Sequence, residues 1–167
     1  MAINRMKWSK LSNARKFAIT LITMVITGAA VGLYLYNMPA RDVVNTSADL
    51  SIKAGDLVSE FLKDATASNE KYLAEDGDSK IVQISGSVYE ISEDMEGMKV
   101  VVLKEKNDKA GVSCTFTKAT NSEIVGLHIG QIVTIKGVIR AGANFDADLE
   151  MYENVILEKC NIIKINK

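Results

Sequence analysis

The sequence predicts a mainly β protein: a small five-stranded Greek-key barrel, preceded by an amphipathic helix and by one transmembrane helix. Three observations lead to this prediction. Residues 17–36 contain no charge. The apolar residues of 54–73 have the spacing of a helix with one buried face. From residue 80 onward the apolar positions alternate with a period of two, as in strands. The 167 residues have room for one membrane segment and one domain.

The uncharged segment, residues 17–36, is long enough to cross a membrane. A helix rises about 1.5 Å per residue, so these residues cover the roughly 30 Å of a bilayer's apolar core. The basic leader, residues 1–16, carries no acid, and it holds Arg5, Lys7, Lys10, Arg15 and Lys16. Because such residues stay on the cytoplasmic side, we expect a single-pass inner-membrane anchor with a cytoplasmic N-terminus and a periplasmic or extracytoplasmic domain.

The two ends of this segment support an uncleaved signal anchor. Tyr34 and Tyr36 suit the far interface, and Pro39 ends the helix. The alternative is a cleaved signal peptide, with Gly28 and Ala30 as small residues at the cleavage site. The apolar run continues through Tyr36, which a signal peptide does not need, and this favours the anchor.

Gly28 and Gly32 form a GxxxG pattern, which lets two membrane helices approach closely. A homodimer formed through this face of the helix is therefore one interpretation of the pattern. Glycine is common in membrane helices for other reasons, and this simpler interpretation is the stronger.

The soluble part is expected to consist of a connector and a helix-plus-barrel domain. Residues 37–53 are predicted to form a polar connector, with a short segment of alternating polar and apolar residues at 49–53. Residues 54–167 form the domain, which begins with the helix at 54–73. The first strand follows at 80–91, with Gly86 where a small barrel must coil.

The remaining elements follow in the order of an OB-fold. Strands are predicted at 97–104, 112–116, 131–139 and 154–165. A helical turn at 121–127 separates the third strand from the fourth, and residues 140–153 form a loop. This order is that of an OB-fold, a partly open Greek-key barrel. A simple meander with an added helix is the alternative.

Several segments resemble the tRNA_anti-like OB-fold family, many of whose members are small envelope proteins of Bacteroidetes-type bacteria. The resemblance covers roughly residues 54–163, with the connector at 36–43 also similar to that of membrane-anchored members. It rests on the segments ASNEKYL (67–73), ISGSV (84–88), VSCTF (112–116), LHIGQIVTIKG (127–137) and LEKCNI (157–162). After Gly137 the chain departs from the family pattern with a longer acidic loop. The resemblance implies the fold and, by analogy with anticodon-binding domains, nucleic-acid binding.

The expected ligand surface is the face of the second and third strands with the adjoining loops. Its candidate ligand-binding residues are Tyr89, Lys99, Lys104, Lys118, Arg140 and Phe145. Acidic residues crowd the same loops, and the chain beyond residue 40 has 15 basic and 21 acidic residues, a net charge of -6. Single-strand binding requires a basic groove with stacked aromatic rings, so nucleic acid is disfavoured.

The sequence offers no catalytic constellation. The single histidine, His128, has no partner at a recognisable spacing, and no cofactor or metal site is predicted. Asp146, Asp148 and Glu150 would share one side of an extended loop and could offer oxygen atoms to calcium. A solubilising acidic loop explains them better. We therefore expect a protein that is not an enzyme.

Cys114 and Cys160 fall on the third and fifth strands, which are neighbours in an OB-fold. An oxidising compartment would permit a disulfide. Two buried free thiols are the alternative.

The predicted function is that of a membrane-anchored, non-catalytic OB-fold binding module in the periplasm. Its expected partner is an envelope protein, a peptide or a glycan. The alternative is a single-stranded nucleic-acid-binding protein.

Overall fold

The structure is a computed structural model that describes residues 12–37, 41–75 and 78–166. It divides into two units, Met1–Arg41 and Asp42–Lys167, which are treated separately below. Three predictions lie wholly or partly outside the described residues: the basic leader up to residue 11, the helix end at Pro39 and the turn at 76–77.

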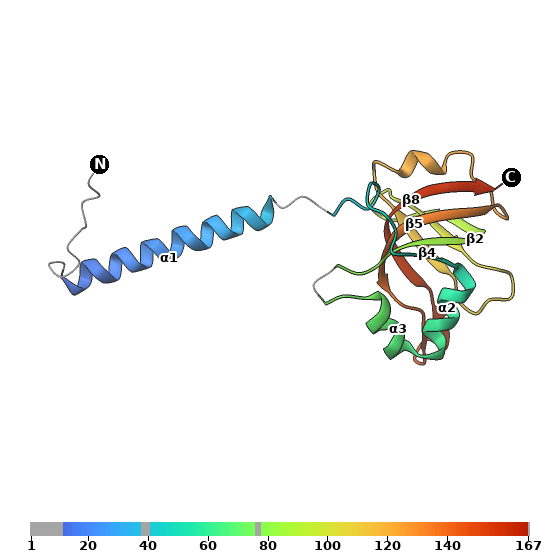
Figure 1. Ribbon diagram of the computed structural model, residues 1–167, viewed down its shortest axis with the longest axis horizontal. Helices are drawn as coiled ribbons and strands as arrows, with labels where there is room; N and C mark the ends of the chain where they lie inside the picture. The colour runs from blue at the N-terminus through green and yellow to red at the C-terminus, as the bar shows by residue number, and fades with distance from the viewer. Residues whose placement is uncertain (1–11, 38–40, 76–77, 167) are drawn as a thin grey trace. The chain divides into compact units, whose positions relative to one another are not determined.

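The first unit contains one long helix, α1 (Asn13–Tyr36) (Figure 1). It begins four residues before the predicted span. The most apolar stretch of 18 residues in this 24-residue helix has a mean hydropathy of 2.0, and none of its residues is buried. The hydroxyls of Thr20, Thr23 and Thr27 donate to backbone carbonyls four residues earlier, so their hydrogen-bonding groups are satisfied within the helix itself. An apolar helix long enough to span a membrane is thus confirmed.

The second unit is a closed barrel built from β2 (Ile81–Glu93), β3 (Lys99–Leu103), β4 (Val112–Phe116), β5 (Ile132–Ala141) and β8 (Val155–Asn166). The sheet order is β1-β2-β3-β4-β8-β5, and β2 also pairs with β5. The β4–β8 pair is parallel and the other barrel pairs are antiparallel. The short helix η2 (Asn121–Ile124) lies between β4 and β5 in sequence. These findings confirm the predicted five-stranded barrel and its order.

Alternation along the strands builds the core. Val112, Cys114 and Phe116 are all buried, whereas Ser113 and Thr115 between them are half-buried. At Gly86 an added Cβ would lie 3.0 Å from Ala54 Cβ and 3.2 Å from Leu103 Cβ. The glycine therefore lets the long strand β2 pass close to Ala54, at the start of the helix that precedes it in the chain.

The predicted helix at 54–73 is in fact two helices, α2 (Ala54–Lys63) and α3 (Ala65–Tyr72). The break occurs at Asp64, whose backbone is extended and whose carboxylate accepts a hydrogen bond from Ala67 N. Aspartate is a strong N-cap residue, so a new helix begins there. Figure 1 shows α2 and α3 together at one end of the barrel.

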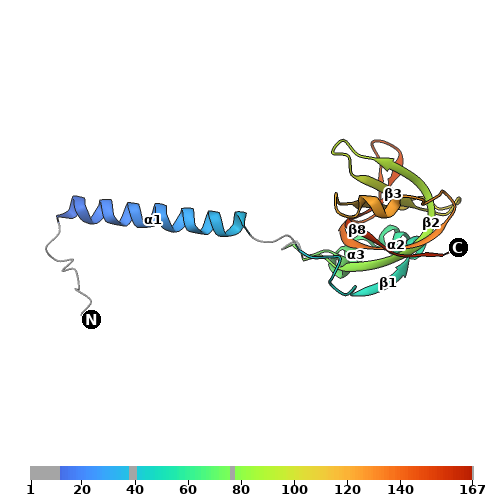
Figure 2. The same ribbon diagram turned by 90° about the horizontal axis from the view of Figure 1, so that it is seen from above.

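The connector predicted at residues 37–53 extends too far: its residues from Asp42 onward belong to the barrel unit, and its last four form the strand β1 (Figure 2). β1 (Leu50–Lys53) pairs in parallel with Val82–Ser85 of β2. Before it, Val43 is only 2% exposed and packs with Ile81 and Val138. The barrel unit therefore begins at Asp42.

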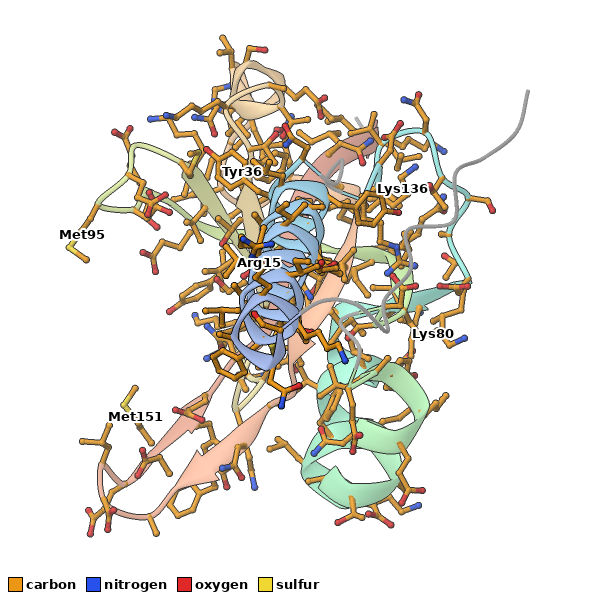
Figure 3. All side chains as sticks on the ribbon, turned by 90° about the vertical axis from the view of Figure 1, so that its left-hand side faces the viewer. Arg15, Tyr36, Lys80, Met95, Lys136 and Met151 are labelled. Carbon is orange, nitrogen blue, oxygen red and sulfur yellow. The ribbon has the colours of Figure 1, made fainter. Side chains whose placement is uncertain are left out.

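One lysine holds this entering segment, which we call the strap (residues 42–48), to the barrel. Lys136 on β5 is 6% exposed, and its ammonium donates to Val44 O at 2.7 Å and to Thr46 O at 2.9 Å. Figure 3 labels this side chain. A buried ammonium is stable only when its protons have acceptors, and the strap carbonyls supply them.

The predicted loop at 140–153 contains a small hairpin, β6 (Asn144–Asp146) and β7 (Met151–Glu153). Phe145 pairs with Tyr152 in its register. The Asp146 carboxylate accepts the backbone N–H groups of Asp148 and Leu149 and so closes the turn. Strands this short carry little periodic signal, which is why the sequence pattern did not reveal them.

Both cysteines are buried free thiols in the structure. Their strands are neighbours, as expected, and Cys160 lies opposite Phe116 in the register, close to Cys114. Burial, and then the neighbouring Cys114 thiol, raise the pKa of the Cys160 thiol well above its usual value. A thiol that resists ionisation reacts slowly. The disulfide itself stays a prediction.

Candidate functional site

The candidate site is a groove between the β6–β7 hairpin and the two barrel helices. We call it the hairpin groove. Its cavity has a volume of about 310 Å³, at the lower end of the range of small-ligand sites. The helix side consists of Phe61, Leu62 and Ala65. The other side consists of Lys109 and of Ala143, Asn144, Phe145 and Tyr152. In Figure 3 the hairpin, marked by Met151, lies at the same end of the barrel as the helices.

The helix wall is fixed by close packing. A Cβ on Gly142 would lie 2.2 Å from the Phe61 ring, so only glycine at 142 lets this ring lie flat against the chain. Phe61 is 1% exposed, and its ring centre is 5.5 Å from that of Tyr72. The helix side of the groove therefore rests on a closely packed, buried Phe61 ring.

A polar cluster holds Tyr72 behind the Phe61 ring. The Tyr72 hydroxyl and the Lys71 ammonium both donate to Glu60 Oε2, each at 2.7 Å. The hydrogen bond from Lys71, and then that from Tyr72, lower the pKa of the Glu60 carboxyl below its ordinary value. Burial is the main cause that raises the pKa of the Tyr72 phenol. Glu60 thus stays an acceptor that orients Tyr72.

The hairpin wall carries an aromatic pair, of which Phe145 is exposed and Tyr152 is half-buried. The ring centres of Phe145 and Tyr152 are 4.9 Å apart and the rings are tilted by 53°. The Lys109 ammonium lies 5.3 Å from the centre of the Tyr152 ring, within cation–π range. Phe145 remains 47% exposed. The pair can therefore stack against an apolar, planar or cationic group of a ligand.

The structure brings only some of the predicted site residues together. Phe145 lies in the hairpin groove. Tyr89 and Lys104 meet elsewhere, with the ammonium 5.5 Å from the ring centre. Lys118 is exposed in the segment between β4 and η2. The six predicted residues do not form one site.

Two of the predicted cations are paired with acids. The Lys99 ammonium contacts Glu93, and Arg140 contacts Glu158 Oε2 at 2.9 Å. The outer positions of β3 and β4 hold Val100, Val102, Ser113 and Thr115 by register, while Phe116 is 1% exposed in the core. The expected ligand face thus lacks stacking rings at these positions.

A second cavity, also of about 310 Å³, lies at the start of α2. Lys53 and Lys104 line it, but so do Asp56, Glu105 and Asp108. Because basic and acidic side chains line this cavity together, it favours neither an anionic nor a cationic ligand. Among the described residues, no cluster of His, Cys, Asp or Glu has the arrangement of a metal site.

Sequence reasoning missed Phe61 and Tyr152 as site residues, and it considered Lys109 only as one of several lysines that could contact a phosphate backbone. A sequence signal for Tyr152 existed: Asn144-Phe145-Asp146 and Met151-Tyr152-Glu153 each place an aromatic residue between polar or flexible ones, around an aspartate-rich turn. No such signal existed for Phe61, because it approaches the hairpin only through the fold.

Comparison with known proteins agrees with this architecture. The model of the tRNA_anti-like family matches residues 6–148. The chain belongs to the tRNA_anti-like family. This family match covers the α1 segment, the connector and the barrel as far as the hairpin turn, and so confirms the resemblance seen in the sequence. No curated protein sequence matches this tRNA_anti-like chain.

Two solved structures resemble this tRNA_anti-like protein. The first is described as a "putative nucleic acid-binding lipoprotein" from Klebsiella pneumoniae subsp. pneumoniae MGH 78578, with a TM-score of 0.51 and 16% identity, covering 76% of this chain and 100% of that one. The second is asparaginyl-tRNA synthetase from Entamoeba histolytica, with a TM-score of 0.40 and 18% identity, covering 73% of this chain and 25% of that one. At these identities the first likeness shows the fold alone.

Proposed function

We propose that this protein is a non-catalytic binding module, held at the inner membrane by an uncleaved α1 with the barrel on the periplasmic side. Its partner is an envelope protein, a peptide or a glycan. The observation that carries this proposal is the hairpin groove, a concave surface lined by the exposed Phe145 ring and the half-buried Tyr152 ring at the end of the barrel. OB-folds commonly bind ligands through the loop that joins the fourth and fifth barrel strands, and the hairpin is part of that loop.

The net charge of the barrel unit and the pairing of its basic residues support a partner other than nucleic acid. Lys99 and Arg140 have acidic partners, and the chain beyond residue 40 carries 15 basic and 21 acidic residues. A polyanion gains most of its affinity from unpaired basic residues along its path, and the paired cations are poorly available for this.

The orientation is tested by protease accessibility. Because the basic residues precede α1 and favour a cytoplasmic N-terminus, protease added to spheroplasts is expected to digest the barrel. A cytoplasmic protein serves as the control for intact membranes. Complete protection of the barrel until the membrane is dissolved would contradict the proposed orientation.

The ligand class is tested with a labelled single-stranded oligonucleotide and the full-length protein in phosphatidylcholine nanodiscs. We expect no measurable binding at low-micromolar protein, even at low salt. A nucleic-acid-binding protein would bind there and lose affinity by orders of magnitude between about 50 and 200 mM salt. Submicromolar, salt-sensitive binding that weakens in the variant Lys99→Ala/Lys104→Ala/Lys118→Ala would overturn the proposal.

A further inference from the structure

The hairpin beside the groove is strongly acidic. Between residues 141 and 157 the chain has no lysine or arginine, and it contains Asp146, Asp148, Glu150 and Glu153. Asp146 is occupied with the turn N–H groups. The side chains of Asp148 and Glu150 are exposed at the hairpin turn. Glu153 is also exposed, but it follows Tyr152 in β7 and so lies on the opposite face of the hairpin from the groove.

The aromatic pair in the groove already holds one cation. Lys109 reaches the Tyr152 ring from the segment between β3 and β4, which shows that an ammonium is accommodated there. The neighbouring ring of Phe145, 47% exposed, offers a similar negative face. A cation from a ligand can occupy it with the acidic side chains nearby.

Apolar side chains continue the surface. Leu149 is 66% exposed at the hairpin turn, and Met151, the first residue of β7, is 53% exposed on the face opposite to Tyr152. Figure 3 shows Met151 projecting from the hairpin. A partner that covers this hairpin must therefore present apolar groups as well as positive charge.

We propose that the hairpin groove binds a cationic segment of a partner protein, in which arginine or lysine side chains lie beside apolar ones. This rests on the proposed function as a binding module and names the partner class for the same site. A cation of the segment stacks on Phe145, and others lie near Asp148 and Glu150 at the hairpin turn. Its apolar side chains cover Leu149 and, where the segment passes around the turn, Met151. Charge complementarity favours this occupant over an acidic polymer, which the hairpin would repel.

The test uses the full-length protein in phosphatidylcholine nanodiscs and a short fluorescein-labelled peptide of arginine and leucine spaced by serine. Fluorescence anisotropy should show saturable binding that weakens with salt. The same peptide with glutamate in place of arginine should not bind. Phe145→Ala should weaken binding about fivefold, the loss expected for one cation–π contact at an exposed site. Phe145→Leu, which keeps an apolar side chain, should weaken it similarly.

Charge variants separate a local site from general attraction. Asp148→Asn/Glu150→Gln should weaken binding and flatten its salt dependence. The control Glu70→Gln/Glu75→Gln removes as much charge from exposed positions elsewhere and should leave the affinity unchanged. Lys109→Ala should strengthen binding, because it frees the Tyr152 ring and removes a like charge.

Three results would overturn the inference: equal binding of the glutamate peptide, unchanged binding in the Phe145 variants, or equal effects of the two double variants. Binding of a neutral oligosaccharide in place of the peptide would end this inference and leave the binding module intact. Submicromolar oligonucleotide binding would end both.

Discussion

Replacing Phe61 by alanine is expected to lower the free energy of unfolding by about 3–5 kcal/mol, the usual cost of removing a buried phenylalanine side chain. Phe61 is 1% exposed and packs against Tyr72 and against Gly142. Its loss leaves a cavity that glycine at 142 cannot fill. Chemical denaturation of the full-length protein in detergent, followed by circular dichroism of the β signal, measures the change.

Leu62→Ala is the matched control for this prediction. Leu62 follows Phe61 in α2 and also lines the groove, but it is half-buried. Its truncation removes less buried apolar area and should cost clearly less. Equal losses in the two variants would contradict the structural role assigned to Phe61.

Replacing Lys136 by methionine is expected to release the strap and to cost about 2 kcal/mol. A hydrogen bond from a charged group contributes about 1.5–3 kcal/mol. Lys136 makes two, to Val44 O and Thr46 O. The cost stays below their sum because Val44 and Thr46 are themselves exposed, so water replaces the ammonium once the strap moves away.

Hydrogen exchange read by mass spectrometry should locate this effect. Peptides that cover residues 42–49 are expected to exchange faster in Lys136→Met, while those from β3 and β4 stay protected. Lys80→Met is the control, since Lys80 is exposed, and it should change neither exchange nor stability. Unchanged protection of the strap in Lys136→Met would show that Val43 and β1 hold it without the lysine.

The strap changes where the barrel unit begins. The sequence pattern alone predicted a connector up to residue 53, whereas the barrel unit begins at Asp42. Only residues 37–41 lie between the end of α1 and this unit. The segment between the two units is therefore much shorter than the sequence pattern predicted.

Local pattern by itself determined the membrane-length helix, the five barrel strands and their order. Each of these depends on signals within about twenty residues or fewer: an uncharged apolar run, or alternation of residues such as Val112, Cys114 and Phe116. The break at Asp64 was also readable in principle, because aspartate caps the helix that follows it.

Only the tertiary structure decided where the candidate site lies. Lys136 reaches carbonyls about ninety residues earlier in the chain, and Phe61 meets Gly142 through the fold. Phe145 was a candidate from the sequence, but Tyr152 and Lys109 join it through a short hairpin and a loop from another part of the barrel. Such contacts join chain segments that are far apart in sequence. Their packing does not change the spacing of apolar residues within either segment, so the sequence pattern does not predict them.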